Sequence, residues 1–219
     1  QKAVKNVWAK DSLLGGTECD IPQEWKDNFY NEWTNIMTAF RGFQCIVCWV
    51  PFNEAWGQFD TPVAVKLTRE LDPTRLINQS SGGNYDLSQG AEGFGDILDV
   101  HHYPCPAMNI FERKFVNVLG EYGGIGLPVE GHTWEIAKKW GYGGNKKDSE
   151  EVMKTYEEYL EMLKVFVQTG CAAAVYTQTT DVEGEVNGLM TYDRKVIKMD
   201  TERLAKANQS VIKSMPAKS

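Results

Sequence analysis

The sequence predicts an α/β protein in which about five parallel strands alternate with helices as part of a (β/α)8 TIM barrel. Short apolar runs alternate with longer segments of helical periodicity, which is the pattern of βα units in a parallel sheet. The apolar runs end in polar residues suited to catalysis, and chemistry in such folds collects at the carboxyl ends of the strands. No glycine-rich phosphate loop follows the first strand, which disfavours a dinucleotide-binding fold.

Four segments are predicted to be helices because apolar residues recur in them at helical spacing. A proline near the start of each of the first two suits the first helical turn. An aspartate precedes each of the last two, and in the third helix a glutamate follows three residues later, as in a capping box. The expected helices cover residues 22–41, 61–72 and 148–170 and a last segment that begins at 200.

Five apolar runs between the helices are predicted to be strands, at residues 46–51, 75–79, 97–103, 115–120 and 172–177. Because a barrel of this type needs eight strands, we expect residues 1–219 to be the C-terminal portion of one catalytic domain. The outer strands would then carry unpaired backbone groups, which invite pairing. We therefore expect either a homo-oligomer or coverage of these edges by the residues before Pro22.

Composition excludes several classes of protein. The net charge of −7 argues against nucleic acid as a partner, and the absence of an apolar run of 18 residues argues against a membrane partner. Seven Trp and nine Tyr suit sugar rings or an ordinary core. Cys45 and Cys48 lie within an apolar run, which favours buried, reduced thiols. An acidic chain poor in disulfides fits the cytoplasm and the bacterial periplasm equally well.

The two strongest candidates for catalysis are glutamates that follow strands. Glu54 lies in VPFNEAWGQ after the first strand, and Glu121 lies in VLGEYGG at the fourth. Two carboxylates on the same rim of a barrel can serve as acid/base and nucleophile in glycoside hydrolysis. The alternative is that one or both are ordinary carboxylates paired with Lys or Arg.

The third strand ends in His101, His102 and Tyr103. Neighbouring residues on a strand point to opposite faces, so His101 and Tyr103 share a face that His102 does not. On that face Tyr103 could donate a hydrogen bond to Glu121, and His101 to a sugar hydroxyl. The alternative is a structural histidine and a core tyrosine.

Acidic residues alternate after the fifth strand, at Asp181, Glu183 and Glu185. They lack the spacing of a calcium-binding loop, so we expect a solvated or helix-capping loop here. No metal site and no cofactor are predicted.

Four motifs in order, N-E-A-W-G-Q, H-H-Y-P, G-E-Y-G-G and DVEGEVNGLMTYDR, resemble glycoside hydrolase family 2, the family of β-galactosidases, β-mannosidases and β-glucuronidases. The resemblance runs from about Asn28 to Lys198. It implies strands four to eight of the family's catalytic barrel. It also implies that the chain starts between strands three and four, so that the β-sandwich domains and the first part of the barrel would belong to the parent protein.

The resemblance implies a retaining, exo-acting, β-galactosidase-like enzyme that hydrolyses O-glycosidic bonds of a β-glycoside by double displacement. Glu54 matches the acid/base and Glu121 the nucleophile, and we expect their carboxyl groups about 5–5.5 Å apart. The rival hypothesis is a non-catalytic carbohydrate-binding remnant or an inactive truncated form, since catalytic groups must be held to within about 0.5 Å.

The same resemblance implies a set of substrate contacts. Asn53 matches the residue that contacts the sugar 2-hydroxyl, and Tyr103 the one that hydrogen-bonds the nucleophile. His101 falls at a position where many members of the family have an Asn or His that faces the sugar. Tyr176 falls near an aromatic position that is commonly Trp in the family. The expected substrate-binding residues are Asn53, Trp56, His101, Tyr103 and Tyr176.

Overall fold

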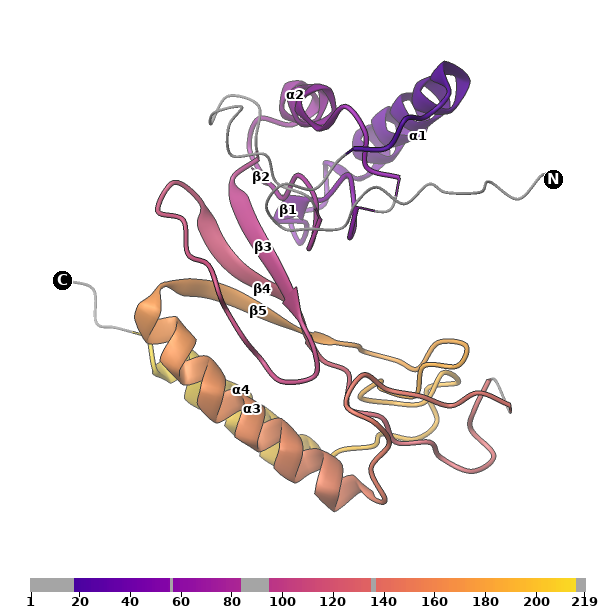
Figure 1. Ribbon diagram of the computed structural model, residues 1–219, viewed down its shortest axis with the longest axis vertical. Coiled ribbons are helices and arrows are strands. Elements are labelled where there is room, and N and C mark those ends of the chain that lie inside the picture. Colours follow the sequence, from indigo (N-terminus) through magenta and orange to yellow (C-terminus); the bar gives the residue numbers. More distant parts are fainter. Residues whose placement is uncertain (1–17, 56, 84–94, 135–136, 216–219) are drawn as a thin grey trace. The chain divides into compact units, whose positions relative to one another are not determined.

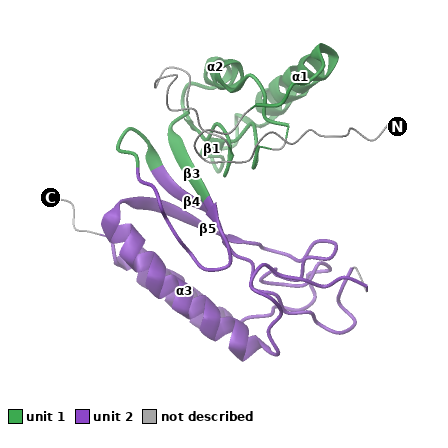
Figure 2. Ribbon diagram, viewed as in Figure 1, with its two compact units in different colours: residues 1–100, 112–116 green, residues 101–111, 117–219 purple. Residues whose placement is uncertain are grey.

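A computed structural model of the protein describes residues 18–55, 57–83, 95–134 and 137–215 (Figure 1). The chain forms two compact units, one made of residues 1–100 and 112–116 and the other of residues 101–111 and 117–219 (Figure 2). Within the described ranges, none of the helices combines the length and apolar character needed to cross a membrane.

The first unit contains two helices and two very short parallel strands. Strand β1 pairs with β2, with Cys48 opposite Leu76, and an isolated bridge between Asn53 and Ser81 continues the pairing beyond the strand ends. The start of β3 also belongs to this unit. The elements are α1 (Gln23–Phe40), β1 (Cys48–Trp49), α2 (Thr61–Leu71), β2 (Leu76–Ile77) and β3 (Ile97–His102).

Aromatic rings fill the space between α1 and the segment after β1. Phe29 of α1 stacks on Phe52 at 5.1 Å between ring centroids and meets Phe59 edge-on at 5.2 Å. Phe52 and Phe59 are buried together with Ala64 of α2. This cluster fixes both ends of the segment that carries Glu54, because Phe52 precedes that residue and Phe59 follows it.

A buried carboxylate joins the end of α2 to β1 and to the residues just before β2. Asp72 accepts hydrogen bonds from Trp49 Nε1 at 2.9 Å, from Thr74 Oγ1 at 2.6 Å and from the Arg75 guanidinium. The hydrogen bonds from Thr74, followed by those from Trp49 and Arg75, hold the pKa of Asp72 well below its usual range. The Arg75 guanidinium also donates to the backbone carbonyl of Ile46.

The second unit is a parallel sheet covered by two helices. Strand β4 (Val116–Gly123) pairs with β5 (Cys171–Thr177), with Tyr122 opposite Tyr176, and the sheet has the order β3-β4-β5. Helix α3 (Ser149–Thr169) contacts both β5 and α4 (Thr201–Lys213), and the two helices run side by side along one face of the sheet (Figure 1).

Three tyrosine rings form the centre of the second unit. Tyr176 of β5 meets Tyr122 of β4 at 5.8 Å and Tyr156 of α3 at 5.3 Å, both in edge-to-face geometry. The Tyr156 hydroxyl donates to Asn208 Oδ1 on α4 at 2.9 Å. Because one cluster reaches two strands and both helices, the face of β4 that carries Tyr122 is occupied by packing.

The four predicted helices are confirmed, and the two aspartate caps act as expected. Asp148 accepts from the Glu151 N–H, and Asp200 accepts from the N–H groups of Glu202 and Arg203. The predicted strands are also present, but they form separate sheets of two and three strands. The first two strands are shorter than predicted, since the Ile46 carbonyl bonds to the Arg75 side chain rather than to a neighbouring strand.

The cysteines correct one expectation. All five are free thiols, but Cys45 is exposed rather than buried, and Cys48 is only half-buried. Burial raises the pKa of the Cys48 thiol, so it is a poor nucleophile at neutral pH.

We predict that Asp72→Asn destabilises the protein in a pH-dependent way. Because the folded-state pKa of Asp72 is depressed, its ionised form stabilises the fold above the unfolded pKa of about 3.9, and that contribution is lost as the pH falls through the folded value. Urea unfolding at pH 7 should show a loss of about 1.5–3 kcal/mol for hydrogen bonds to a charged group, and the difference from wild type should shrink below about pH 4.

The control for this measurement is Asp20→Asn, which changes an exposed aspartate of the same unit. It should alter stability by less than about 0.5 kcal/mol. A difference between wild type and Asp72→Asn that is equally large at pH 7 and at pH 3 would contradict the assignment.

Candidate active site

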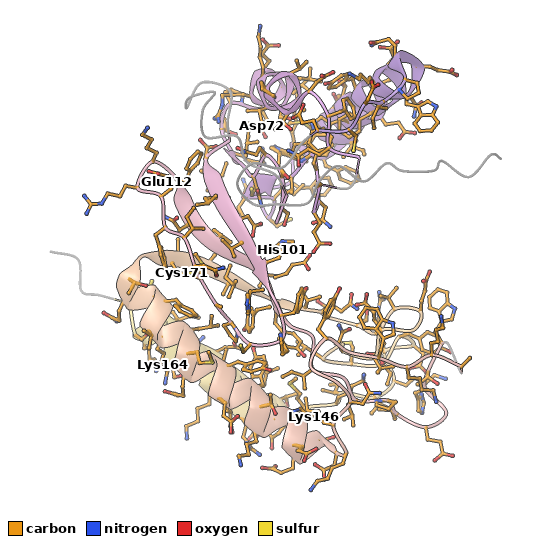
Figure 3. All side chains as sticks on the ribbon, in the orientation of Figure 1. Asp72, His101, Glu112, Lys146, Lys164 and Cys171 are labelled. Atoms are coloured by element: carbon orange, nitrogen blue, oxygen red, sulfur yellow. The ribbon has the colours of Figure 1, made fainter. Side chains whose placement is uncertain are left out.

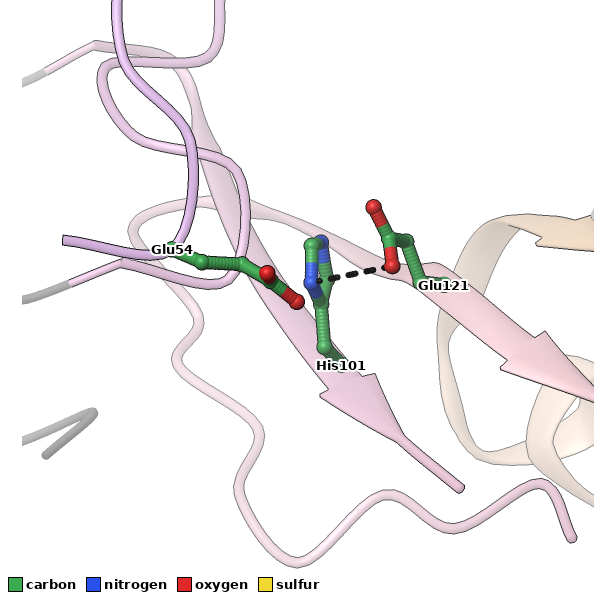
Figure 4. A group of neighbouring side chains, drawn as sticks. All are labelled: Glu54, His101 and Glu121. Atoms are coloured by element: carbon green, nitrogen blue, oxygen red, sulfur yellow. Dashed lines mark ion pairs between the residues drawn. The ribbon is translucent and has the colours of Figure 1, made fainter. Parts of the chain in front are cut away.

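Glu121 lies near the carboxyl end of β4, on the face opposite Tyr122. Its side chain is 25% exposed, and its Oε2 accepts a hydrogen bond from the Tyr103 hydroxyl. His101 Nδ1 lies 3.6 Å from the same oxygen, the ion-pair contact drawn in Figure 4. One carboxylate oxygen therefore faces both residues that the period-two pattern of β3 places on a common face.

His101 and His102 have different surroundings, as predicted. Figure 3 shows His101 near the carboxyl end of β3. The His101 side chain is 8% exposed and faces Glu121, whereas His102 Nδ1 donates to the backbone carbonyl of Cys105 at 2.7 Å. Burial, together with the hydrogen bond to Glu121, raises the pKa of Tyr103. The Tyr103 hydroxyl therefore stays protonated and remains a donor to the carboxylate.

Glu54 occupies a strained turn that follows β1 by a few residues, in the first unit. Its φ is 45° and that of Ala55 is 60°, so two consecutive residues with side chains adopt the left-handed conformation that favours glycine. The Glu54 N–H donates to the Ser81 carbonyl at 2.7 Å, and the Ser81 N–H donates to the Phe52 carbonyl at 2.9 Å. Such strain persists only where the surrounding structure fixes it, and it is concentrated at functional sites.

Ser81 also connects this turn to a buried carboxylate that the sequence analysis did not single out. The Ser81 hydroxyl donates to Asp99 Oδ2 at 2.8 Å, and Asn78 Nδ2 donates to the same oxygen at 2.6 Å. Asp99 is 2% exposed. The turn that carries Glu54 is thus attached through Ser81 to the middle of β3.

The other predicted site residues have different outcomes. Asn53 is exposed beside Glu54 on the turn. Trp56 lies outside the described residues.

Tyr176 is placed where the sequence analysis did not expect it. Its ring packs against Tyr122 and Tyr156, and its hydroxyl accepts from the Ile125 N–H and donates to the Asn187 carbonyl, both at 3.2 Å. Tyr176 is paired in register with Tyr122, whose side chain points away from the face that carries Glu121. The ring of Tyr176 therefore has a packing role in this structure, and its contact with a substrate stays a prediction.

Tyr142 is a neighbour of the site that the sequence analysis missed. Its ring stacks on Tyr103 at 3.8 Å between centroids, with 12° between the planes. The approach requires glycine at 124, where φ is +63° and a Cβ atom would lie 2.6 Å from Tyr142 Cδ2. The available signal was the run W-G-Y-G-G, whose glycines allow close backbone approach.

The acidic loop after β5 is solvated at Glu183, as expected, but Asp181 is buried. Lys198 Nζ donates to Asp181 Oδ1 at 2.6 Å and to the Val186 carbonyl at 2.9 Å, and the Gly188 N–H donates to the same Asp181 oxygen at 2.8 Å. The side chains of this pair are only 1–2% exposed. The expectation was wrong for Asp181 because Lys198, far along the chain, returns to neutralise it.

Comparison with solved structures relates the fold to known proteins, whereas two other comparisons find no match. No family model matches the sequence, and no curated protein matches it. The crystal structure of an FMN-binding beta-glucuronidase from Facaelibacterium prausnitzii L2-6 matches with a TM-score of 0.54 and 20% sequence identity, over 85% of this chain and 32% of that one. The chain thus spans about a third of the length of that structure. At this identity the similarity shows the fold alone, which is an α/β fold with parallel strands.

We predict that Gly124→Ala moves the Tyr142 ring away from Tyr103. The added methyl would overlap Tyr142, and overpacking of this kind costs about 1–3 kcal/mol beyond the cost of a left-handed residue with a side chain. Gly131→Ala is the matched control, because φ there is +77° and nothing lies within 4 Å of the added Cβ.

Unfolding in urea, with near-ultraviolet circular dichroism as a probe of tyrosine packing, compares the two variants. Gly124→Ala should lose more stability than Gly131→Ala and should change the spectrum. Equal losses with unchanged spectra would show that the stacking on Tyr103 does not depend on this glycine.

Proposed function

We propose that the chain carries the catalytic residues of a retaining β-glycosidase related to glycoside hydrolase family 2. The observation that supports this most directly is the surroundings of Glu121, where Tyr103 donates to a carboxylate oxygen that His101 also faces. Hydrogen bonding to a carboxylate favours its ionised form. An ionised, oriented and partly exposed carboxylate is what a nucleophile for the anomeric carbon requires.

Glu54 is the proposed acid/base. Its strained backbone, held by Ser81, is the kind of feature found where a functional side chain must point in one direction. For retention of configuration we propose that the two carboxyl groups come within about 5–5.5 Å in the active protein. Asn53, exposed on the same turn, is the proposed contact for the sugar 2-hydroxyl.

The reaction proceeds in two displacements. Glu54 gives its proton to the glycosidic oxygen while a Glu121 oxygen attacks the anomeric carbon, so that the bond to the leaving group breaks and a glycosyl ester forms. Glu54 then takes a proton from water, the water oxygen attacks the same carbon, and the ester bond breaks to release the sugar and the Glu121 carboxylate. Tyr103 keeps its proton throughout and orients Glu121 by its hydrogen bond.

The substrate proposed from the sequence resemblance is a β-galactoside, and the structural neighbour, a beta-glucuronidase, makes a β-glucuronide the alternative. That neighbour is also FMN-binding. The second unit of this chain contains a groove whose lining does not suit the phosphate group of such a cofactor. The groove has a volume of about 800 Å3 and lies among α3, α4 and β5, and its described lining residues are apolar apart from Tyr122 and Asn208. No basic side chain among them could hold a phosphate group.

We predict that Glu121→Ala lowers kcat on p-nitrophenyl β-galactoside and β-glucuronide by about 10⁴-fold or more, since it removes the nucleophile. Azide should partly restore turnover and give a glycosyl azide of inverted anomeric configuration, because azide attacks directly from the vacated side. Glu158→Ala, which removes an exposed glutamate of α3, is the control and should keep wild-type activity.

Glu54→Ala should slow substrates with poor leaving groups most, since it removes the proton donor, and azide should then give a product of retained configuration. The opposite pattern in the two variants would reverse the assigned roles. A wild-type chain that binds sugars but hydrolyses neither substrate would contradict catalysis by this chain and support the non-catalytic alternative.

A further inference from the structure

A row of aromatic rings leads from Glu121 to the surface of the second unit. Tyr103 donates to Glu121, and Tyr142 stacks on Tyr103. Trp140 meets Tyr142 edge-on at 5.1 Å, with 73° between the ring planes. Tyr142 and Trp140 are each 42% exposed, so the row that begins at Glu121 ends in exposed aromatic surface.

The backbone around Trp140 is fixed although its ring is exposed. The Trp140 N–H donates to the Gly184 carbonyl at 3.0 Å, and the Val186 N–H donates to the Trp140 carbonyl at 2.9 Å. A Cβ atom on Gly184 would lie 3.3 Å from Trp140 Nε1, so this glycine lets the indole lie close to the backbone. An aromatic side chain that is already ordered loses little entropy when a ligand covers it.

A carboxylate lies beside these rings. Glu185 pairs with Trp140 in an isolated parallel bridge, and paired residues of neighbouring extended segments place their side chains on the same face. Glu185 Oε2 accepts from Gln178 Nε2 at 3.0 Å and from Asn187 Nδ2 at 3.3 Å. Among the residues that the structure describes, none donates to Glu185 Oε1, which leaves that oxygen available to a ligand.

We propose that Trp140, Tyr142 and Glu185 bind the leaving-group sugar of a β-linked oligosaccharide. This inference rests on the proposed function, because it places the sugar next to the bond that is cleaved beside Glu121. The C–H groups on the apolar face of a sugar ring suit the exposed aromatic faces, and a carboxylate oxygen accepts hydrogen bonds from sugar hydroxyls. The ligand class is a neutral sugar, since Glu185 repels the carboxylate of a uronic acid or a sulfate group.

Kinetics with two leaving groups test this site. The β-glycosyl fluoride has a leaving group too small to reach Trp140, whereas the corresponding disaccharide, lactose for a β-galactosidase, carries a neutral leaving-group sugar. In Trp140→Ala the ratio of kcat/KM for lactose to kcat/KM for the fluoride should fall about 10-fold, a typical loss for an aromatic contact. Trp140→Phe keeps a ring and should restore part of the ratio.

Trp134→Ala is the matched control, because Trp134 is a more exposed tryptophan of the same unit whose ring contacts Tyr192 rather than this row. It should leave the ratio unchanged. Glu185→Gln should raise the rate on a disaccharide with a uronic acid as leaving group relative to lactose. An unchanged ratio in Trp140→Ala, in an enzyme that Glu121→Ala inactivates, would overturn this inference and leave the proposed function intact.

A separate measurement covers a chain that hydrolyses neither substrate, which would contradict the proposed function. Lactose is then titrated into the wild-type chain while the indole N–H resonances are followed by NMR, with Trp140→Ala used to assign the Trp140 signal. A shift of that signal, and binding that is retained in Trp134→Ala but lost in Trp140→Ala, would support the sugar site. No shift of that signal would overturn it.

Discussion

The hydrogen bond from Tyr103 to Glu121 is the contact on which the candidate site of the second unit depends. It forms because strand alternation on β3 turns Tyr103 and His101 to one face, and alternation on β4 turns Glu121 to that face and Tyr122 to the other. The tyrosine core behind β4 then fixes the strand. The geometry of the carboxylate thus follows from how the opposite face of the same strand is packed.

Patterns among residues close together in the sequence correctly predicted the four helices and the face of β3 that carries His101. Asp148 and Asp200 cap helices as expected because capping involves residues two or three positions apart. The contrast between His101 and His102 followed from the strand period alone. The lengths of β1 and β2 were not predictable in this way. The Ile46 carbonyl accepts a hydrogen bond from the side chain of Arg75, which follows α2 in the sequence whereas Ile46 precedes it.

Tyr176 and Asp181 make contacts that sequence reasoning did not anticipate, for physical reasons. The register that pairs Tyr176 with Tyr122 decides which face the ring occupies, and a change of one residue in register exchanges the two faces. Asp181 looked like part of a solvated loop because its partner Lys198 is distant in sequence. Removing two charges from water is costly, and here the Val186 carbonyl and the Gly188 N–H supply further hydrogen bonds to the pair.

The buried pair also determines what the loop can present at its surface. Val186 and Gly188 are bound by Lys198 and Asp181, and Val186 is bonded in turn to the backbone of Trp140. Glu185 directly precedes Val186 in the sequence, so the same ion pair helps to hold the backbone that carries Glu185 and Trp140. A rigid aromatic surface binds at lower entropic cost than a mobile one, so a buried pair that lies away from the proposed sugar site can still contribute to binding by holding the backbone that carries Trp140 and Glu185.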